Sequence, residues 1–380
     1  MAERRDKRLP RKAGGRAGGR ARRAGLPGTP AEFDPDYVAL DLTYRCNLAC
    51  SFCFMTESRS KAAPGGELTL AELKELVDGL SQRPRKFYLA GGEPSLKKGL
   101  AELVSHIKKR GHFCRITTNA FGLGKDGASR LMDSGLDEFT VSLHGEPAVH
   151  DKIVGAKGAA ARIEELFRLV ASRENRRTTI SAWCTISGPN HARLYKAYRY
   201  FSSLKPDSVM FSHMDYITGR DLAATKAILR SRLGSGTVLK ASEHLVAGIS
   251  AAALAKEIEK IKAGRGAAVN FFPDLSREEL EAWYSPSSGF QKRGFCLAQW
   301  KGLWLGPRGE LVPCQPLGHE MGSVRKTPPL KAFSAGPAAK FRKALLSQGG
   351  FLPTCSRCGR SSYSSTYCLK AAVPAGTGKP

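Results

Sequence analysis

The chain has 380 residues, of which 42% are hydrophobic, and its formal net charge is +26. This length and apolar content can fill the core of one large α/β domain with a smaller domain beside it, which excludes a chain that is disordered throughout. No apolar run approaches the ~18 residues of a membrane span, and the N-terminus lacks the apolar centre of a secretory signal. We therefore expect a cytoplasmic protein whose ten cysteines are thiols rather than disulfides.

Residues 1–36 are predicted to be a disordered basic tail, and residues 373–380 a second disordered tail. The first 25 residues contain ten lysines and arginines against two acids, are rich in glycine and have almost no apolar side chains. Such a tail suits a weak contact with a polyanion such as RNA, through its phosphates. A leader that only improves solubility is the alternative, and the sequence leaves both interpretations open.

From residue 37 the chain alternates short apolar runs with longer amphipathic ones, a pattern typical of βα units with parallel strands. The predicted helices lie near residues 69–81, 97–110, 126–134, 158–172 and 190–203. The six predicted strands cover residues 37–43, 86–94, 113–120, 138–145, 178–186 and 208–214. Such a core, residues 37–218, forms either an open doubly wound sheet or a full or partial barrel. Both architectures place their chemistry at the carboxyl ends of the strands.

The second half of the chain is less regular. Residues 219–289 are predicted to be a linker or helical insertion, with one helix in the stretch AAALAKEIEKIKAG. Residues 290–372 lack regular periodicity and contain a group of cysteines, so a small domain organised by metal is expected there. Two further cysteines, Cys114 and Cys184, stand alone in strand-like runs and are expected to be buried and inert.

Three cysteines, Cys46, Cys50 and Cys53, occur within eight residues directly after the first predicted strand. Four thiolates would close a zinc site, and two would suffice for a redox pair. An odd number indicates a metal centre with one position kept for a ligand from outside the protein. Part of a zinc site that is completed elsewhere in the chain remains an alternative.

This spacing, with the aromatic Phe52 before the third cysteine, resembles the CxxxCxΦC motif of the radical S-adenosylmethionine (SAM) superfamily. The resemblance implies a partial (β/α)6 barrel of the TIM type, followed here by a small irregular iron–sulfur domain. It also implies a [4Fe–4S] cluster on Cys46, Cys50 and Cys53, with SAM on the fourth iron. The reduced cluster of such enzymes cleaves SAM to a 5′-deoxyadenosyl radical, which abstracts a hydrogen atom from the substrate.

The resemblance extends to the expected SAM site. The segment GGEP at the end of the second strand matches the glycine-rich motif that receives the methionine amino group, and Phe52 would pack near the cluster and adenine. Polar residues after the third and fourth strands resemble contacts to the SAM ribose or carboxylate. The residues implied to contact SAM are Phe52, Gly91, Gly92, Glu93, Pro94, Thr117, Asn119, Ser142 and His144.

The second cysteine group resembles the C-terminal extension called SPASM, or twitch in its shorter form. Cys296, Gly309 and Cys314 fit its opening, and Cys355, Cys358 and Cys368 follow. Ser364 stands where the full version has a cysteine, and no cysteine follows Cys368. The resemblance therefore implies one auxiliary [4Fe–4S] cluster on Cys296, Cys314, Cys355 and Cys358, with Cys368 able to replace one of the last two. A structural zinc site is the alternative.

The predicted function is a radical SAM enzyme that oxidatively modifies its substrate by dehydrogenation or cross-linking. The resemblance implies an electron donor such as flavodoxin or ferredoxin. The substrate, whether peptide, sugar, nucleotide or lipid, and the catalytic residues stay unknown. Gln315 follows Cys314 where sulfatase-maturing relatives have an acidic base, which disfavours that activity. The alternative of another class is a basic RNA-binding protein with zinc sites and no enzymatic activity.

Overall fold

The structure is a computed structural model that describes residues 34–53, 55, 66–83, 85–234, 236, 240–264, 266–290, 295–334, 336–359 and 368–369. Apart from residues 34–36, both predicted tails lie outside the described residues, as does Ser364. Among the residues that are described, no helix has the length and apolar character needed to cross a membrane.

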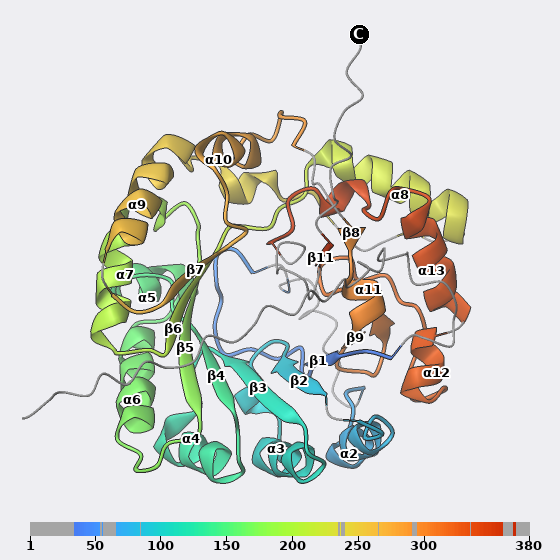
Figure 1. Cartoon of the computed structure of the whole chain (residues 1–380), viewed down its shortest axis with the longest axis horizontal. Helices are drawn as coiled ribbons and strands as arrows, with labels where there is room; N and C mark the ends of the chain where they lie inside the picture. Colours follow the sequence, from blue (N-terminus) through green and yellow to red (C-terminus); the bar gives the residue numbers. More distant parts are fainter. Residues whose placement is uncertain are drawn as a thin grey trace, which may run out of the picture.

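A single curved sheet of nine strands forms the centre of the molecule (Figure 1). The strand order is β10-β9-β1-β2-β3-β4-β5-β6-β7, and every neighbouring pair is parallel except β9 and β10. The bounds are β1 Tyr37–Asp41, β2 Lys86–Ala90, β3 Phe113–Thr118, β4 Glu138–Ser142, β5 Thr179–Thr185, β6 Ser208–Ser212, β7 Val269–Phe272, β9 Gly302–Leu305 and β10 Leu311–Val312.

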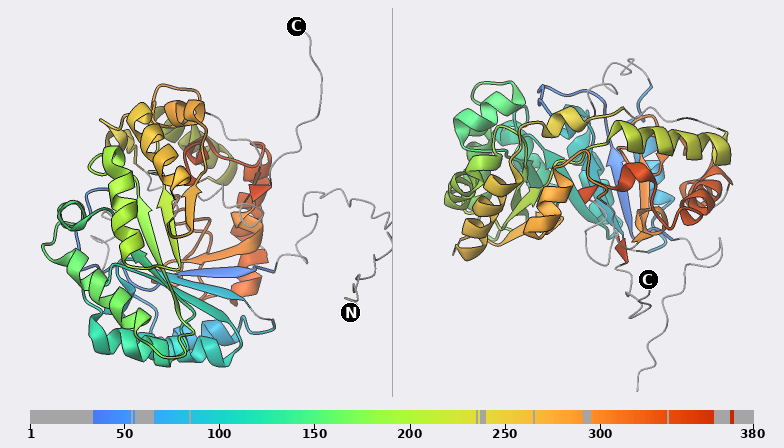
Figure 2. Two further views of the ribbon diagram at one scale, coloured as in Figure 1. Left: turned by 60° about the vertical axis from the view of Figure 1, so that its left-hand side comes forward. Right: turned by 90° about the horizontal axis from the view of Figure 1, so that it is seen from above.

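Helices cover the convex face of this sheet, and the C-terminal segment lies across its open side (Figures 1 and 2). The helices that follow the strands up to β7 are α2 Leu70–Asp78, α3 Leu100–Lys109, α4 Gly124–Asp133, α5 Pro147–Val154, α6 Ala159–Ala171, α7 Leu194–Ser203, α8 Gly219–Leu233 and α9 Ala251–Ala263. Side-chain caps begin several of them: Thr69 and Glu72 form a capping box on α2, and Ser250 caps α9.

The strands alternate between two environments, which decides where the cavity of this protein lies. On β2, Phe87 and Leu89 are fully buried in the main hydrophobic core, whereas Tyr88 and Ala90 line the cavity on the concave side. Successive side chains of a strand point to opposite faces, so one face of the sheet packs against helices and the other is left for a ligand.

The predicted α/β fold class is confirmed, and each of the six predicted strands contains an observed one. The stretch predicted as a linker is more structured than expected. It holds α8, α9 and the strand β7, which extends the parallel sheet beyond β6. Four residues are too few to show a periodic pattern, so the pairing with β6 is what makes this segment a strand.

The C-terminal segment also joins the sheet. Its strand β9, with the sequence GLWL, is buried at all four positions and pairs in parallel with β1. The remaining elements are α10 Arg277–Trp283, β8 Phe295–Cys296, α11 Ala298–Lys301, α12 Pro329–Ser334, α13 Gly336–Leu346 and β11 Cys368–Leu369. Residues 302–312 therefore add two strands to the core sheet, although this region was expected to be irregular.

Candidate active site

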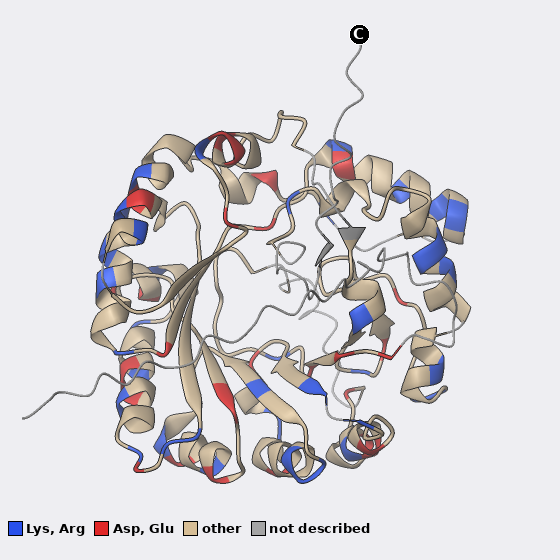
Figure 3. Ribbon diagram, viewed as in Figure 1, with Lys and Arg blue, Asp and Glu red and all other residues tan. Residues whose placement is uncertain are grey.

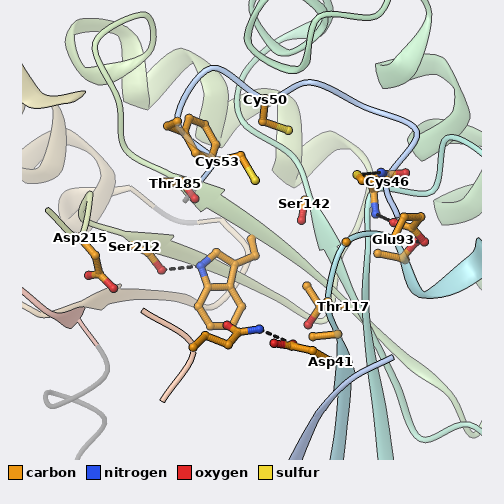
Figure 4. A pocket seen from close by; sticks show the side chains of 18 of the residues that line it. Asp41, Cys46, Cys50, Cys53, Glu93, Thr117, Ser142, Thr185, Ser212 and Asp215 are labelled. Atoms are coloured by element: carbon orange, nitrogen blue, oxygen red, sulfur yellow. Dashed lines mark hydrogen bonds between the residues drawn. The ribbon is translucent and has the colours of Figure 1, made fainter. Parts of the chain in front are cut away.

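A cavity of about 370 Å³ lies at the carboxyl ends of the parallel strands, where this architecture is expected to place chemistry. Five polar side chains at strand ends line it and come from five different strands (Figure 4). They are Asp41 on β1, Thr117 on β3, Ser142 on β4, Thr185 on β5 and Ser212 on β6.

The loop that carries Cys46, Cys50 and Cys53 crosses one side of this cavity, and all three half-buried thiols line it (Figure 4). Two backbone bonds fix the loop to the end of α5. Ala49 N–H donates to Val154 O at 3.1 Å, and Ser51 N–H donates to Ile153 O at 3.0 Å. Buried Leu48 packs against the same two residues, so the middle of the loop has its own small apolar anchor.

The glycines of GGEP lie directly against the base of the cysteine loop. Gly92 N–H donates to Thr43 O at 2.7 Å, and Glu93 N–H donates to Arg45 O at 2.8 Å. A Cβ on Gly92 would lie 2.0 Å from Arg45 O, and Gly91 has a φ of +120° that L side chains rarely adopt. The structure thus requires glycine at both positions, because they pass the loop backbone so closely.

Glu93 is 1% exposed, and its carboxylate is fully engaged by protein donors. It accepts hydrogen bonds from Ser95 N–H at 3.0 Å, Thr118 Oγ1–H at 2.7 Å and Asn119 N–H at 2.8 Å. Burial raises the pKa of this carboxyl, and the three donors oppose that shift. Although Glu93 lines the cavity, these bonds make it a brace between the ends of β2 and β3.

Asn119 links the third strand to the cysteine loop. Its Nδ2 donates to Asn47 Oδ1 at 2.9 Å and lies 3.9 Å from Cys46 Sγ, and its Oδ1 accepts from Phe121 N–H at 2.9 Å. Asn47, inside the cysteine motif, was not singled out from the sequence. Asn119 and Asn47 therefore fix the end of the third strand to the start of the cysteine loop.

The remaining predicted SAM contacts divide by position. Phe52 and His144 line the cavity with their rings 5.0 Å apart, edge to face, as do Thr117 and Ser142 through their side chains. Pro94 is buried in the short 3₁₀ turn Pro94–Leu96 and is not one of the residues that line the cavity. The structure therefore brings eight of the nine predicted residues, all but Pro94, to the cavity lined by the three cysteines.

His144 is held by the backbone and is neutral. The ring nitrogen Nδ1 of His144 accepts from Thr185 N–H at 3.2 Å. The backbone N–H of His144 donates to Nδ1 of His150 at 3.1 Å. Burial lowers the pKa of His144 well below its usual range and that of His150 to about 4. These two imidazoles fasten the end of β4 to β5 and α5.

The second cysteine group lies behind the C-terminal wall of the cavity. Gln315, next to Cys314, donates through Nε2 to Asp41 (Figure 4), and Gly359 N–H, next to Cys358, donates to Asp215 at 2.6 Å. Gln315 and Gly359 line the cavity among the described residues, whereas the cysteines of this group do not. Cys314 and Cys358 are therefore each adjacent in the chain to a residue that lines the cavity.

The segment Cys355–Cys358 is positioned by the side chains between its cysteines. Arg357 is 1% exposed and donates from Nε to Trp283 O at 2.9 Å and from Nη2 to the oxygens of Ser288. Ser356 Oγ–H donates to Asp221 Oδ2 on α8 at 2.9 Å. Cys296 and Cys368 face each other as backbone partners in the β8–β11 pair.

Residues 40–200 match the sequence profile described as "Radical SAM superfamily". This part of the chain is therefore similar to a radical SAM domain. The similarity implies SAM and a [4Fe–4S] cluster as cofactors, and it favours the enzyme prediction over a non-enzymatic zinc protein.

Two curated relatives show how far the similarity to named radical SAM enzymes extends. Over 158 residues the chain is 31% identical to PqqA peptide cyclase of Methylocella silvestris, a stretch that covers 41% of this chain and 38% of that protein. Over 138 residues it is 33% identical to Fe-coproporphyrin III synthase of Methanosarcina barkeri, covering 35% and 34%. The match thus spans little more than a third of either relative's length.

Solved structures extend the likeness in fold beyond the radical SAM domain. SuiB of Streptococcus suis superposes with a TM-score of 0.58 at 15% identity, over 86% of this chain and 73% of that one. The structure described as native anSMEcpe with bound AdoMet superposes with a TM-score of 0.57 at 14% identity, over 88% and 92%. At these identities the comparison shows the fold alone.

Several residues of the cavity were not singled out from the sequence. Trp183 donates through its indole to Ser212 (Figure 4), and Arg115, Thr185 and Phe272 also line the cavity. A signal existed in the period-two alternation of the strands, which separates inward from outward residues. Cys114 and Cys184, one position away from inward residues, are buried as predicted, and burial raises the pKa of both thiols.

Proposed function

We propose that this chain is an enzyme that uses SAM and a [4Fe–4S] cluster on Cys46, Cys50 and Cys53 to modify a peptide oxidatively. The observation that carries the proposal is that one loop brings three half-buried thiols to a single cavity, directly above the segment Gly91–Glu93. When bound, SAM and the reduced cluster together supply a 5′-deoxyadenosyl radical.

The donor set fits such a cluster better than a single ion. Within the described part of the chain, no group of three or more His, Cys, Asp or Glu side chains is arranged to hold one metal ion. The three thiolates of an iron–sulfur cluster do not have to point at one ion, because each thiolate binds a different iron. The loop fixed at Ala49 and Ser51 presents the thiols from one side, which leaves the cavity side open for SAM.

The chain's own residues would then hold SAM beside these thiols. In this proposal the carbonyl groups near Gly91 receive the amino group of SAM, and the hydroxyls of Thr117 and Ser142 face its ribose or carboxylate. Glu93 and Asn119, whose side chains are bonded within the protein, act by keeping the glycine segment and the cysteine loop together.

The second cysteine group is proposed to bind one auxiliary [4Fe–4S] cluster in a SPASM- or twitch-like domain at residues 290–372. Cys314, Cys355, Cys358 and Cys296 are all half-buried. Cys368 joins them as a fifth candidate, because antiparallel partners such as Cys368 and Cys296 have Cα atoms roughly 5 Å apart. A cluster here would accept the electron of the substrate radical that remains after hydrogen abstraction, which supports an oxidative reaction.

A peptide is the substrate class that the relatives support. One curated relative is named a peptide cyclase, and a structure of SuiB is described as bound to the precursor peptide SuiA. The other relative is named a porphyrin synthase, so its name points to a different substrate.

The test is SAM cleavage by the anaerobically reconstituted full-length chain with dithionite as electron source. We expect 5′-deoxyadenosine from the wild type, none above background from Cys53→Ala, and wild-type yield from Cys114→Ala. Cys114 is the matched control, since it is a buried thiol on β3 that does not line the cavity. Equal yields from Cys53→Ala and the wild type would contradict the proposal.

A further inference from the structure

Arg115 is the only lysine or arginine among the described residues that line the cavity. The chain contains 60 lysines and arginines, and Figure 3 shows those of the described residues mostly on the outer helices and loops. A guanidinium inside the barrel is costly unless a group of opposite charge compensates it. The protein therefore has to provide a partner for Arg115, or leave it for a ligand.

The neighbours of Arg115 come from the two adjacent strands. In register with it lie Tyr88 on β2 and Glu138 on β4. The guanidinium stacks over the Tyr88 ring, 4.0 Å from its centroid, and the shortest distance from Arg115 Nη1 to Glu138 Oε2 is 4.0 Å. That distance is at the limit of an ion pair and too long for a hydrogen bond.

One oxygen of Glu138 is occupied elsewhere, and one donor of Arg115 has no partner. The other carboxylate oxygen of Glu138, Oε1, accepts from the hydroxyls of Thr140 and Ser181, each at 3.2 Å. Arg115 Nε is buried and has no hydrogen-bond partner among the described residues. The protein therefore does not fully compensate this guanidinium by itself.

We infer that Arg115 binds a carboxylate of the substrate at the base of the cavity. Nε is buried, so the two terminal nitrogens are the part of the guanidinium that a ligand in the cavity can reach, and Nη1 lies too far from Glu138 for a hydrogen bond. A carboxylate matches these two nitrogens with two parallel N–H···O bonds, and stacking on Tyr88 fixes the plane in which they form.

The position of Arg115 also orients the acid. On the same face of β3, Thr117 lies two residues nearer the strand end, so Arg115 is one layer deeper than the rim that faces the cysteine loop. The aromatic residues Tyr88, Trp183, Phe272 and Trp304 also line this cavity. The substrate, a peptide in the proposed function, therefore places a carboxylate on Arg115, and the aromatic or apolar part next to that carboxylate extends toward the cysteines.

That this acid is the substrate rests on the proposed function, whereas the carboxylate site itself does not. The probes are 4-hydroxyphenylpropanoate and its amide, which differ in charge and have the same aromatic body. Their affinities are measured by equilibrium dialysis on the anaerobically reconstituted full-length chain with saturating SAM. SAM affinity and SAM cleavage are measured on the same preparations, so a failure of the proposed function is seen separately.

The wild type is expected to bind the acid about tenfold or more tightly than the amide, as charge-assisted bonds to a buried arginine imply. Arg115→Met should abolish this preference with SAM affinity unchanged, and Arg115→Lys should keep part of it. Arg130→Met, at an exposed arginine of α4, should behave as the wild type.

Three results would overturn the inference. They are equal affinity for acid and amide in the wild type, no binding of the acid, and a preference that survives in Arg115→Met. A loss of SAM affinity in Arg115→Met would assign the guanidinium to the SAM carboxylate instead, which also overturns a substrate site.

Discussion

The two cysteine groups of this protein are held in place by different means. The first group lies on one short loop, which backbone bonds fix to α5 and to the glycine segment after β2. The second group is spread from Cys296 to Cys368, and its pair Cys355 and Cys358 depends on buried side chains such as Arg357. The first is a local motif on a scaffold of parallel strands, whereas the second exists only once distant segments have met.

This difference predicts separate sensitivities. Changes that move the backbone near residue 45 should affect the first group alone, and changes to the buried polar anchors should affect the second. The following predictions run from the largest expected effect to the smallest.

Gly92→Ala should abolish SAM cleavage. Its Cβ would lie 2.0 Å from Arg45 O, so the cysteine loop would have to move away from the end of β2. Gly188→Ala is the control, because a Cβ there meets nothing nearer than 3.9 Å and the backbone is not left-handed. The 5′-deoxyadenosine yield of the reconstituted proteins measures the effect, and a normal yield from Gly92→Ala would show that the loop tolerates displacement.

Arg357→Met should destabilise the second group selectively, by about 3–5 kcal/mol for the loss of a buried hydrogen-bonded cation. The carbonyl of Trp283 and the carboxylate of Asp221 would each lose one of their partners. Iron content should fall by about half while the first cluster remains. Arg162→Met, at an exposed arginine of α6, should change neither stability nor iron. Full iron content in Arg357→Met would show that Arg357 does not hold the second cysteine group in place.

Stability should fall between about pH 6.5 and pH 4 because of the buried histidines. The folded pKa of His150 is about 4, below its unfolded value, so the unfolded state binds more protons in this window and acid favours unfolding. The shift corresponds to at most about 3 kcal/mol. Denaturant unfolding at several pH values should show that the unfolding free energy of His150→Gln depends less on pH than that of the wild type. An equal dependence on pH would contradict the role given to His150.

Glu93→Gln should cost about 1–3 kcal/mol of unfolding free energy, because an amide cannot accept all three hydrogen bonds that the carboxylate accepts. Glu102→Gln, which removes an exposed ion pair with Lys74, should cost less than about 1 kcal/mol. Thermal unfolding measures the loss of unfolding free energy in each variant. Equal losses would show that Glu93 contributes no more than an exposed acid.

Much of the architecture could be predicted because it is encoded locally. The six strands, the cysteine loop and the glycine segment follow from short patterns in which neighbouring residues carry the signal. Strands β7 and β9 were missed, because four residues each become strands only through pairing with β6 and β1.

The partners of the site residues could not be predicted from the sequence. Glu93 is a brace because Thr118 and Asn119 lie beside it after folding, and Arg115 faces the cavity because β2 and β4 flank it. In the sequence, Arg357 is one basic residue between two cysteines. Its anchoring role requires the carbonyls of Trp283 and Ser288. These are long-range contacts that no local pattern contains.

The most direct measurement is iron analysis of the anaerobically reconstituted chain in three forms. They are the wild type, Cys46→Ala/Cys50→Ala/Cys53→Ala, and Cys355→Ala/Cys358→Ala. Two independent clusters predict about eight irons in the wild type and about four in each variant, with SAM cleavage lost only when the first group is changed. Zinc in place of iron at either group, or loss of all iron in both variants, would contradict two separately held clusters.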